Sequence, residues 1–427
     1  MRSLMRTSVQ PPVPLVPGSM RALVVDGVGV DHVAVMSVPT PRPGPRQLLC
    51  RVDAAGICTS VNKLIDQGAE HPLMLGWDPA KFPVIAGDEG AVTVALVGEE
   101  LHGRYQRGQR FAVQPAVDHA PMNDLERYGD KASAIEKIAV GYTLPGLLAE
   151  YVLIGEEVLA ASCLVPLPVA SLPAAHVAIA EPLSCVISSH AHHLHLAQRD
   201  TISPRTALTG LGRGSVVVVI GAGPMGRMHV DLALAARPQS LLVADVLDDR
   251  LSRLRELFSA RAARLGVELV TVNSAREDLR GAVDAASEGL GADDVIVAVA
   301  NGAAIEAAQH LLARNGVLNL FGGLPAGRTT VAIDGRLVHY REVNITGSSG
   351  GSPWDVMEAL RLMADGEIDP GVHIAHVGDL EHAPQLLEMA RVQAIDGKAV
   401  VYPHRRTSSL LAVARWDAED ERRYLAG

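Results

Sequence analysis

The sequence predicts an α/β protein with two principal domains, one rich in β-strands and one built on a doubly wound parallel sheet. Three observations support this prediction. The 427 residues exceed one ordinary domain. In the first part of the chain, short apolar runs alternate with glycine and proline, as in RALVVDGVG and GAVTVALVG. From about residue 186 to 345, apolar strands alternate with helical stretches, which is typical of a parallel sheet.

The same patterns give the domain boundaries. Residues 1–19 are rich in proline and predict a disordered leader before Met20. We expect the β-rich domain over residues 20–186, the parallel-sheet domain over 187–345 and a return to the first domain over 346–404. The charged residues 405–427 predict an exposed C-terminal tail.

Composition excludes several classes of protein. The formal net charge is −10 and no basic block is present, which argues against nucleic acid or an anionic membrane as a partner. No apolar run is long enough for a membrane span, and the leader lacks the apolar core of a secretory signal. The four cysteines show no CxxC spacing, which argues against a zinc ribbon or a redox pair. We therefore expect a cytoplasmic protein without a membrane partner.

The strongest motif is GAGPMG, which supplies Gly221, Gly223 and Gly226. It follows the apolar run 216–220 and opens a helical stretch, as a Rossmann turn requires. The glycines allow a tight turn, a close approach of the pyrophosphate and close helix packing. The helix amino terminus, with Pro224 and Met225, then faces the phosphates.

An acidic residue in LLVADV supports a dinucleotide site. Asp245 lies at the end of the second predicted strand, about 20 residues beyond the glycines. A carboxylate there accepts hydrogen bonds from the ribose hydroxyls and repels a 2′-phosphate, so NAD is favoured over NADP. Arg250 lies close enough in sequence to favour the opposite preference. A structural glycine turn in another α/β protein is the alternative.

Candidate reactive groups concentrate in three segments, AAGICTSVNK, VIAGDEGAV and IAEPLSCVISS. Each also has a structural explanation: a buried thiol, a turn or an acid at a helix amino terminus. In this order, the segments resemble those of the medium-chain dehydrogenase/reductase family, over nearly all of residues 20–404. AEPLSCV is similar to the third-ligand segment of the polyol dehydrogenase branch. GQRFAVQPA, EPLSCVI, GAGPMG, VHYREV and ITGSSGG resemble the L-sorbose-1-phosphate reductase subgroup.

The resemblance implies a GroES-like catalytic domain and a catalytic Zn²⁺. The implied metal ligands are Cys58, Asp88 and Glu181, with Glu89 as an alternating or supporting carboxylate. Such a metal acts as a Lewis acid during hydride transfer. Ser60 matches the proton-relay hydroxyl of the family, and Lys63 stands where relatives often have a relay histidine.

The chain departs from the family pattern at the metal ligands. Asp88 replaces the usual histidine, and Val61 replaces the aspartate that orients it. A carboxylate ligand has no ring N–H to satisfy, so the two changes are mutually consistent. The harder ligand set weakens the preference for zinc, and a metal-free site remains the alternative. A structural zinc is not expected, because residues 117–144, which predict a long irregular loop, contain no cysteine.

Two further groups of residues have less certain roles. The run SHAHHLHL contains four histidines, His190, His192, His193 and His195. It predicts a polar helix face, and a metal patch built from the i,i+3 histidine pairs is the alternative. For a phosphorylated substrate, Arg336 or Arg341 and the backbone of residues 348–351 are candidate phosphate holders. An interdomain turn explains this second segment equally well.

Together these features predict an NAD-dependent oxidoreductase that interconverts an alcohol and a ketone on a sugar, sugar phosphate or cyclitol with the help of a metal. One alternative is a metal-independent reductase in which Ser60 or Lys63 transfers the proton. The other is a silent NAD-binding homologue, against which the joint presence of Cys58, Glu89 and Glu181 argues. The resemblance also implies a homodimer or a homotetramer.

Overall fold

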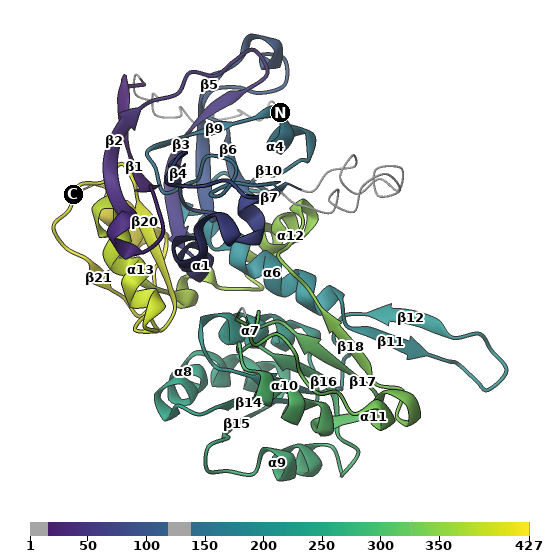
Figure 1. Ribbon diagram of the computed structural model, residues 1–427. Helices are drawn as coiled ribbons and strands as arrows, with labels where there is room; N and C mark the ends of the chain where they lie inside the picture. Colours follow the sequence, from purple (N-terminus) through teal and green to yellow (C-terminus); the bar gives the residue numbers. More distant parts are fainter. Residues whose placement is uncertain (1–15, 118–137, 326, 427) are drawn as a thin grey trace, which may run out of the picture.

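The computed structural model describes residues 16–117, 138–325 and 327–426, and shows two lobes joined through helix α6 (Figure 1). The predicted leader falls mostly on residues 1–15, outside this part of the chain. Ordered structure begins before Met20, however, because Ser19 already pairs with Pro39 and Thr40 N–H donates to Gly18 O. The expected leader therefore extends too far at its carboxyl end.

The upper lobe contains the predicted β-rich domain. A small sheet has the order β2-β1-β4, and a larger sheet has the order β10-β6-β5-β3-β20-β19-β21, with β9 also paired to β3. The first sheet comprises β1 (Ser19–Val25), β2 (Val33–Pro39) and β4 (Val84–Ile85). The second comprises β3 (Leu48–Ile57), β5 (Gly90–Val97), β6 (Arg110–Val113), β9 (Tyr151–Ile154), β10 (Leu164–Pro166), β19 (Ile374–Asp379), β20 (Lys398–Tyr402) and β21 (Leu411–Ala412).

The long sheet brings distant segments together. The carboxyl end of β3 pairs with the start of β5 on one side, through Ala55 and Gly90, and with β20 on the other, through Ile57 and Ala399. Helices α1 (Thr59–Gln67) and α13 (Ala383–Arg391) pack beside this point, and α4 (Glu156–Ala160) lies farther along the lobe (Figure 1). Three chain segments therefore meet where β3 ends.

The lower lobe is a six-stranded parallel sheet with the order β15-β14-β13-β16-β17-β18, which is the doubly wound Rossmann arrangement. This confirms the predicted fold class. Its strands are β13 (Val216–Ile220), β14 (Ser240–Asp245), β15 (Glu268–Asn273), β16 (Ala292–Val297), β17 (Leu312–Leu320) and β18 (Asn344–Gly347).

Helices cover both faces of this sheet because alternate residues of each strand point to opposite sides. Val217 and Val219 of β13 pack with α7 and α8, whereas Val216 and Val218 pack with α9 and α10. These helices are α7 (Pro224–Ala236), α8 (Asp248–Leu265), α9 (Leu279–Ala286) and α10 (Gly302–Ala308), and α11 (Gly335–Tyr340) precedes β18.

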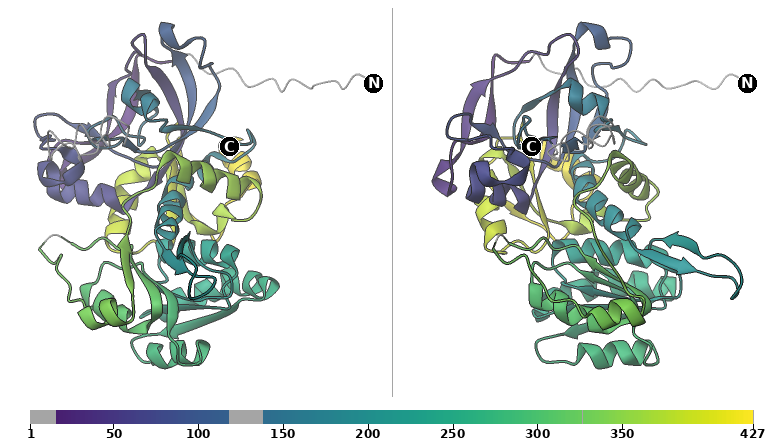
Figure 2. Two further views of the ribbon diagram at one scale, coloured as in Figure 1. Left: turned by 90° about the vertical axis from the view of Figure 1, so that its right-hand side faces the viewer. Right: turned by 45° about the vertical axis from the view of Figure 1, so that its right-hand side comes forward.

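Helix α6 (Ala180–Ala191) connects the two lobes, as the two side views also show (Figure 2). It follows the short α5 (Ala174–Ala178) and packs against α12 (Pro353–Ala364) and α7. After α6 the chain forms the lower lobe, and it later returns to the upper lobe through β19 and β20. A residue at the start of α6 and a residue at its end therefore belong to different lobes.

The C-terminal segment is packed against the upper lobe, contrary to the expectation of an exposed tail. Trp416 and Glu421 are both buried. The Glu421 carboxylate, on α14 (Ala418–Ala426), accepts hydrogen bonds from the backbone N–H groups of Ala174 and Ala175, at 2.8 and 2.9 Å, and from the Tyr402 hydroxyl at 2.8 Å. The charged composition predicted exposure, and it does not show that one of these acids, Glu421, is buried and hydrogen-bonded.

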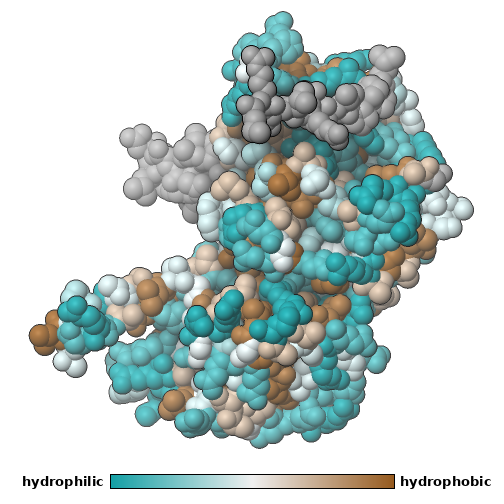
Figure 3. All heavy atoms as spheres, turned by 180° about the vertical axis from the view of Figure 1, so that it is seen from behind, coloured by the Kyte–Doolittle hydropathy of each residue, from teal (hydrophilic) through white to brown (hydrophobic). Residues whose placement is uncertain are grey.

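A β-hairpin projects from the junction of the lobes (Figure 1). It consists of β11 (Leu194–Ala197) and β12 (Thr206–Thr209), which pair with each other. Apolar side chains appear along its surface (Figure 3), including Leu196, Ile202 and Leu208, which are largely exposed.

The expected irregular loop at 117–144 lies largely outside the described residues. Its described ends form β7 (Ala116–Val117) and β8 (Ile138–Ala139), which pair with each other. In the described part of the chain, no helix is long and apolar enough to cross a bilayer.

Candidate active site

The carboxyl end of β3 carries a compact group of potential metal ligands. Cys58 precedes α1, and Asp88 and Glu89 precede β5. One ligand atom from each of these three residues lies within 4.8 Å of the others. The antiparallel pairing explains this proximity, because Gly56 N–H donates to Glu89 O at 3.0 Å. A Cβ on Gly56 would overlap the Glu89 carboxylate, so glycine at this position leaves room for that side chain.

Glu181 approaches the same group from the first turn of α6, although it lies outside the 4.8 Å set. Burial raises the pKa of Glu181 well above its usual range, and the charges of Glu89 and Asp88 raise it further. Cys185, one turn later, donates to Glu181 Oε1 at 3.5 Å. The four predicted ligands are therefore electrostatically coupled, with Cys185 beside them.

The pKa shifts in this cluster show that its acidic groups oppose one another's ionisation. Burial and the neighbouring Asp88 and Glu89 raise the pKa of the Cys58 thiol well above its usual range. Burial and Glu89 likewise raise the pKa of Asp88 to about 6. A group of acids that oppose one another's ionisation is stabilised by a bound cation.

The structure also reveals a residue that the sequence reasoning missed. Lys398, the first residue of β20, is buried, and its Nζ lies 2.5 Å from Glu89 Oε1. Burial alone would lower the pKa of Lys398, but Glu89 and Cys58 raise it above its usual range. The only sign of this residue in the sequence is a lysine at the start of the apolar run KAVVY. Its partner Glu89 could not be inferred, because it lies 309 positions away.

Within the part of the chain that the structure describes, two buried carboxylate oxygens of this cluster have no hydrogen-bond partner, namely Asp88 Oδ1 and Glu89 Oε2. The other oxygens of the two residues are occupied: Asp88 Oδ2 accepts from Ser60 Oγ at 2.6 Å, and Glu89 Oε1 accepts from Lys398. Buried acceptors without donors are costly unless a cation or water meets them. A thiol, two unpartnered carboxylate oxygens and Glu181 form a donor set that fits a divalent metal.

The other two residues predicted for proton transfer lie on α1. Ser60 contacts Asp88 as described, and the Tyr142 hydroxyl lies 3.5 Å from the same Asp88 oxygen. Lys63 is exposed and points toward the lower lobe, because its Nζ lies 3.6 Å from the position that a Cβ on Gly323 would occupy. Ser60 and Lys63 therefore connect the acidic cluster to the space between the lobes.

The glycine motif forms the turn between β13 and α7. Gly221 has φ of +109°, a conformation that favours glycine, and a Cβ on Gly226 would overlap Gly221 O. Pro224 and Met225 form the first turn of α7. The backbone N–H groups of this turn face the carboxyl edge of the sheet, where dinucleotides bind in such folds.

Asp245 and Arg250 both lie beside this turn. Asp245 Oδ2 accepts from Ala222 N–H at 2.7 Å, and Oδ1 accepts from Leu247 N–H at 3.0 Å. Arg250 Nη1 lies 3.8 Å from Asp245 Oδ2, and the same nitrogen lies 3.7 Å from a Cβ position on Gly223. The structure thus brings together every residue predicted for the cofactor.

Two minor expectations are wrong. Arg341 does not lie near residues 348–351, because β18 separates them. Arg341 precedes the amino end of this strand and donates to Leu290 O at 3.4 Å, whereas residues 348–351 follow its carboxyl end. The predicted polar helix face does not extend over His192, His193 and His195, because α6 ends at Ala191 and β11 begins at Leu194.

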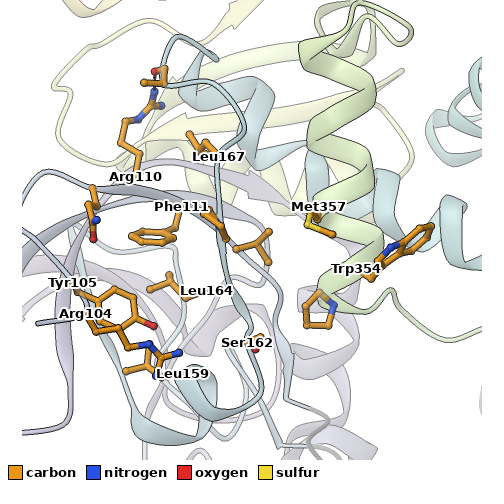
Figure 4. A pocket seen from close by; sticks show the side chains of 15 residues that line it. Arg104, Tyr105, Arg110, Phe111, Leu159, Ser162, Leu164, Leu167, Trp354 and Met357 are labelled. Carbon is orange, nitrogen blue, oxygen red and sulfur yellow. Dashed lines mark hydrogen bonds between the residues drawn. The ribbon is translucent and has the colours of Figure 1, made fainter. Parts of the chain in front are cut away.

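A hollow also lies elsewhere, between β6, β10 and α12 (Figure 4). It has a volume of about 670 Å³ and is lined mainly by apolar and aromatic side chains, among them Tyr105, Phe111 and Trp354. No residue predicted for chemistry lines it. This hollow is therefore separate from the candidate reaction centre.

Comparison with known proteins agrees with this geometry. The alcohol dehydrogenase GroES-like domain family matches residues 44–168, and the zinc-binding dehydrogenase family matches residues 224–365. The chain is 30% identical over 389 residues to mannitol-1-phosphate 5-dehydrogenase of Aliivibrio fischeri, an alignment that covers 88% of this chain and 85% of the relative. It is 29% identical to L-sorbose 1-phosphate reductase of Klebsiella pneumoniae, over 83% of this chain and 82% of the relative.

The solved structures support the fold. A zinc-binding dehydrogenase from Sinorhizobium meliloti, crystallised with NADP, superposes with a TM-score of 0.71 at 24% identity. The match covers 91% of this chain and all of the other.

Proposed function

The chain belongs to the zinc-type medium-chain dehydrogenase family, and we propose that it oxidises a secondary alcohol of a sugar phosphate, or reduces the corresponding ketone, with NAD(H) as the hydride carrier. It is an alcohol or polyol dehydrogenase by relationship. The observation that carries the proposal is that one chain combines two unpartnered carboxylate oxygens, on Asp88 and Glu89, with a dinucleotide-binding glycine turn at Gly221.

Cys58, Asp88 and Glu181 would hold a divalent metal. Glu89 would support it, or alternate with one of these ligands, while Lys398 holds its other oxygen. Bound there, a metal of the zinc class supplies Lewis acidity that favours loss of the substrate hydroxyl proton. Lys398 donates to Glu89 Oε1 and so brings a positive charge into an otherwise acidic cluster.

Ser60 would receive the substrate proton. Its own hydrogen is directed to Asp88 Oδ2, which leaves the lone pairs of Oγ available to accept a hydrogen bond from a substrate hydroxyl. As Ser60 accepts the substrate proton, its own proton would pass to Asp88 Oδ2, 2.6 Å away. Lys63 lies one helical turn farther along α1, on the side that faces solvent.

Asp245 would select the cofactor. Its carboxylate lies at the end of β14, beside the turn that faces the pyrophosphate, and its negative charge disfavours a 2′-phosphate. Arg250 sits 3.8 Å away and partly offsets that charge. We propose NAD as the preferred cofactor, with NADP used less well.

A phosphorylated substrate is supported by the two relatives and by one cation. The names of both relatives specify sugar phosphates. Lys63 faces the space between the lobes, and among the described acidic side chains none pairs with it. An unpaired lysine at this place is suited to a substrate phosphate or to the proton path.

The test is a screen of mannitol 1-phosphate, sorbose 1-phosphate, their unphosphorylated forms and a cyclitol, with NADH formation or consumption as the readout. We expect turnover of a phosphorylated substrate and its loss in Cys58→Ala. Turnover of none of these compounds by protein loaded with zinc would contradict the proposal.

A metal-independent reaction is the second candidate, and the Ser60–Asp88 contact favours it. With no metal, Ser60 can pass its proton to Asp88 Oδ2 as it accepts one from the substrate, because the pKa of Asp88 lies near 6. Full activity after exhaustive chelation, with no bound metal detected, would establish this candidate.

A further inference from the structure

A second group of potential ligands lies where α6 ends, away from the predicted reaction centre. His193 joins α6 to β11, and His195 is the second residue of β11. Both rings converge on one oxygen of Asp294, in the middle of β16. His193 Nδ1 lies 2.6 Å and His195 Nε2 lies 2.9 Å from Asp294 Oδ1.

Unpartnered atoms accompany this convergence. Asp294 and His193 are completely buried, yet Asp294 Oδ2 and His193 Nε2 have no hydrogen-bond partner among the described residues. One ligand atom from each of His193, His195 and Asp294 lies within 4.8 Å of the others. Buried polar atoms are normally paired, so the free Asp294 Oδ2 is suited to a cation held beside the two rings.

We propose that His193, His195 and Asp294 form a second metal site, which takes a divalent ion of the zinc class. Two imidazoles and one carboxylate are a known three-ligand set for such ions, which bind nitrogen and oxygen at about 2 Å. Ligand atoms around a tetrahedral ion of this size lie about 3.3 Å apart. The two separations from Asp294 Oδ1, 2.6 and 2.9 Å, would therefore widen by less than about 1 Å, and the ion replaces the ring protons that now lie against Asp294.

The position of the site suggests its effect on the fold. In the described part of the chain, β11 pairs with β12 alone, and a two-stranded hairpin is marginally stable in water. Its root is held by His195 and by a hydrogen bond of 3.3 Å from Asn344 Nδ2 to Leu194 O. An ion shared by β11 and β16 would fasten the hairpin to the parallel sheet.

This site is independent of the proposed reaction. It shares no residue with the Cys58 cluster, which α6 separates from it by nearly the full length of the helix. His195 remains partly exposed, with 22% of its side chain accessible, so an ion can enter from solvent.

The test compares Zn²⁺ uptake by stripped full-length protein in equilibrium dialysis. His195→Gln removes the imidazole but keeps an N–H donor for Asp294, so it preserves the hydrogen bond and removes the ligand. His192→Gln is the matched control, because His192 is exposed and contacts only Ser188 O. The double variant Cys58→Ser/Asp88→Asn disables the other cluster.

We expect His195→Gln to bind one zinc equivalent less than the wild-type protein, and His192→Gln to bind as many as the wild type. The double variant should retain the equivalent that His195→Gln loses. Zinc should also slow hydrogen exchange of the β11 amides at least tenfold in the wild type and not in His195→Gln. Equal uptake by His195→Gln and wild type would overturn the proposal. If His195→Gln fails to fold, absence of zinc binding by the double variant would overturn it.

Discussion

Lys398 Nζ lies 2.5 Å from Glu89 Oε1, and both side chains are buried at the junction of β3, β5 and β20. Among the described residues, this is the only ion pair that we find within the group of acids around Cys58. Removal of the lysine would leave a buried carboxylate without a partner beside two other acids.

Lys398→Met should therefore lower the free energy of unfolding by about 3–5 kcal/mol, the cost of a buried charge that loses its partner. Lys398→Arg should recover much of the loss. Urea denaturation measures both. Lys81→Met is the control, because Lys81 forms an exposed pair with Asp78. Equal stability of Lys398→Met and Lys81→Met would show that the buried pair contributes nothing.

Ser60→Ala should reduce kcat by about 10²-fold or more, because it removes the proposed proton acceptor. Ser60→Thr should retain most activity, since the hydroxyl remains. Steady-state kinetics on the substrate found by the screen measures the effect. An unchanged kcat in Ser60→Ala would exclude the relay.

Asp245→Asn should shift the ratio of kcat/KM values for NAD and NADP toward NADP by about tenfold, or about 1.4 kcal/mol. Asparagine removes the negative charge and keeps only one of the two acceptor oxygens, so it retains the hydrogen bond from either Ala222 N–H or Leu247 N–H but not both. Asp249→Asn, in the exposed first turn of α8, is the control and should leave the ratio unchanged. A ratio that stays constant in Asp245→Asn would show that another group selects the cofactor.

His229 predicts a loss of stability in acid. Burial, with a smaller effect of His193, lowers the pKa of His229 to about 3. In the unfolded chain, His229 is protonated as the pH falls below about 6.5, whereas in the folded chain it stays neutral until about pH 3. The free energy of unfolding therefore falls as the pH drops through this range. His229→Gln should reduce this slope by up to about 1.4 kcal/mol per pH unit.

Denaturation curves between pH 7 and pH 4 measure that slope. His310→Gln, at an exposed position, is the control and should keep the wild-type slope. A slope that His229→Gln leaves unchanged would mean that the acid sensitivity arises elsewhere.

Glu421→Gln should destabilise the protein by about 1–3 kcal/mol, because hydrogen bonds to a charged acceptor are lost at the start of α5. Glu419→Gln is the control on the same helix, since Glu419 pairs with exposed arginines. Thermal unfolding compares the two variants. If both unfold at the same temperature, the C-terminal segment is not anchored through Glu421.

The sequence alone determined the features that local patterns encode. The run 216–220 followed by GAGPMG predicted a strand, a glycine turn and a helix, because each depends on residues close together in the chain. Asp245 followed from the same local spacing. The alternation of strands and helices then implied the parallel sheet.

Only the tertiary structure decided which side chains meet. Lys398 reaches Glu89 through the register of β20 on β3, and a register is fixed by strand pairing rather than by either strand's own sequence. His193 and His195 converge on Asp294 because α6 stops two residues before β11 begins, which turns an expected helical face into a junction. Partners about 100 and 309 residues apart leave no periodic signal, since their contact is a property of the packed chain.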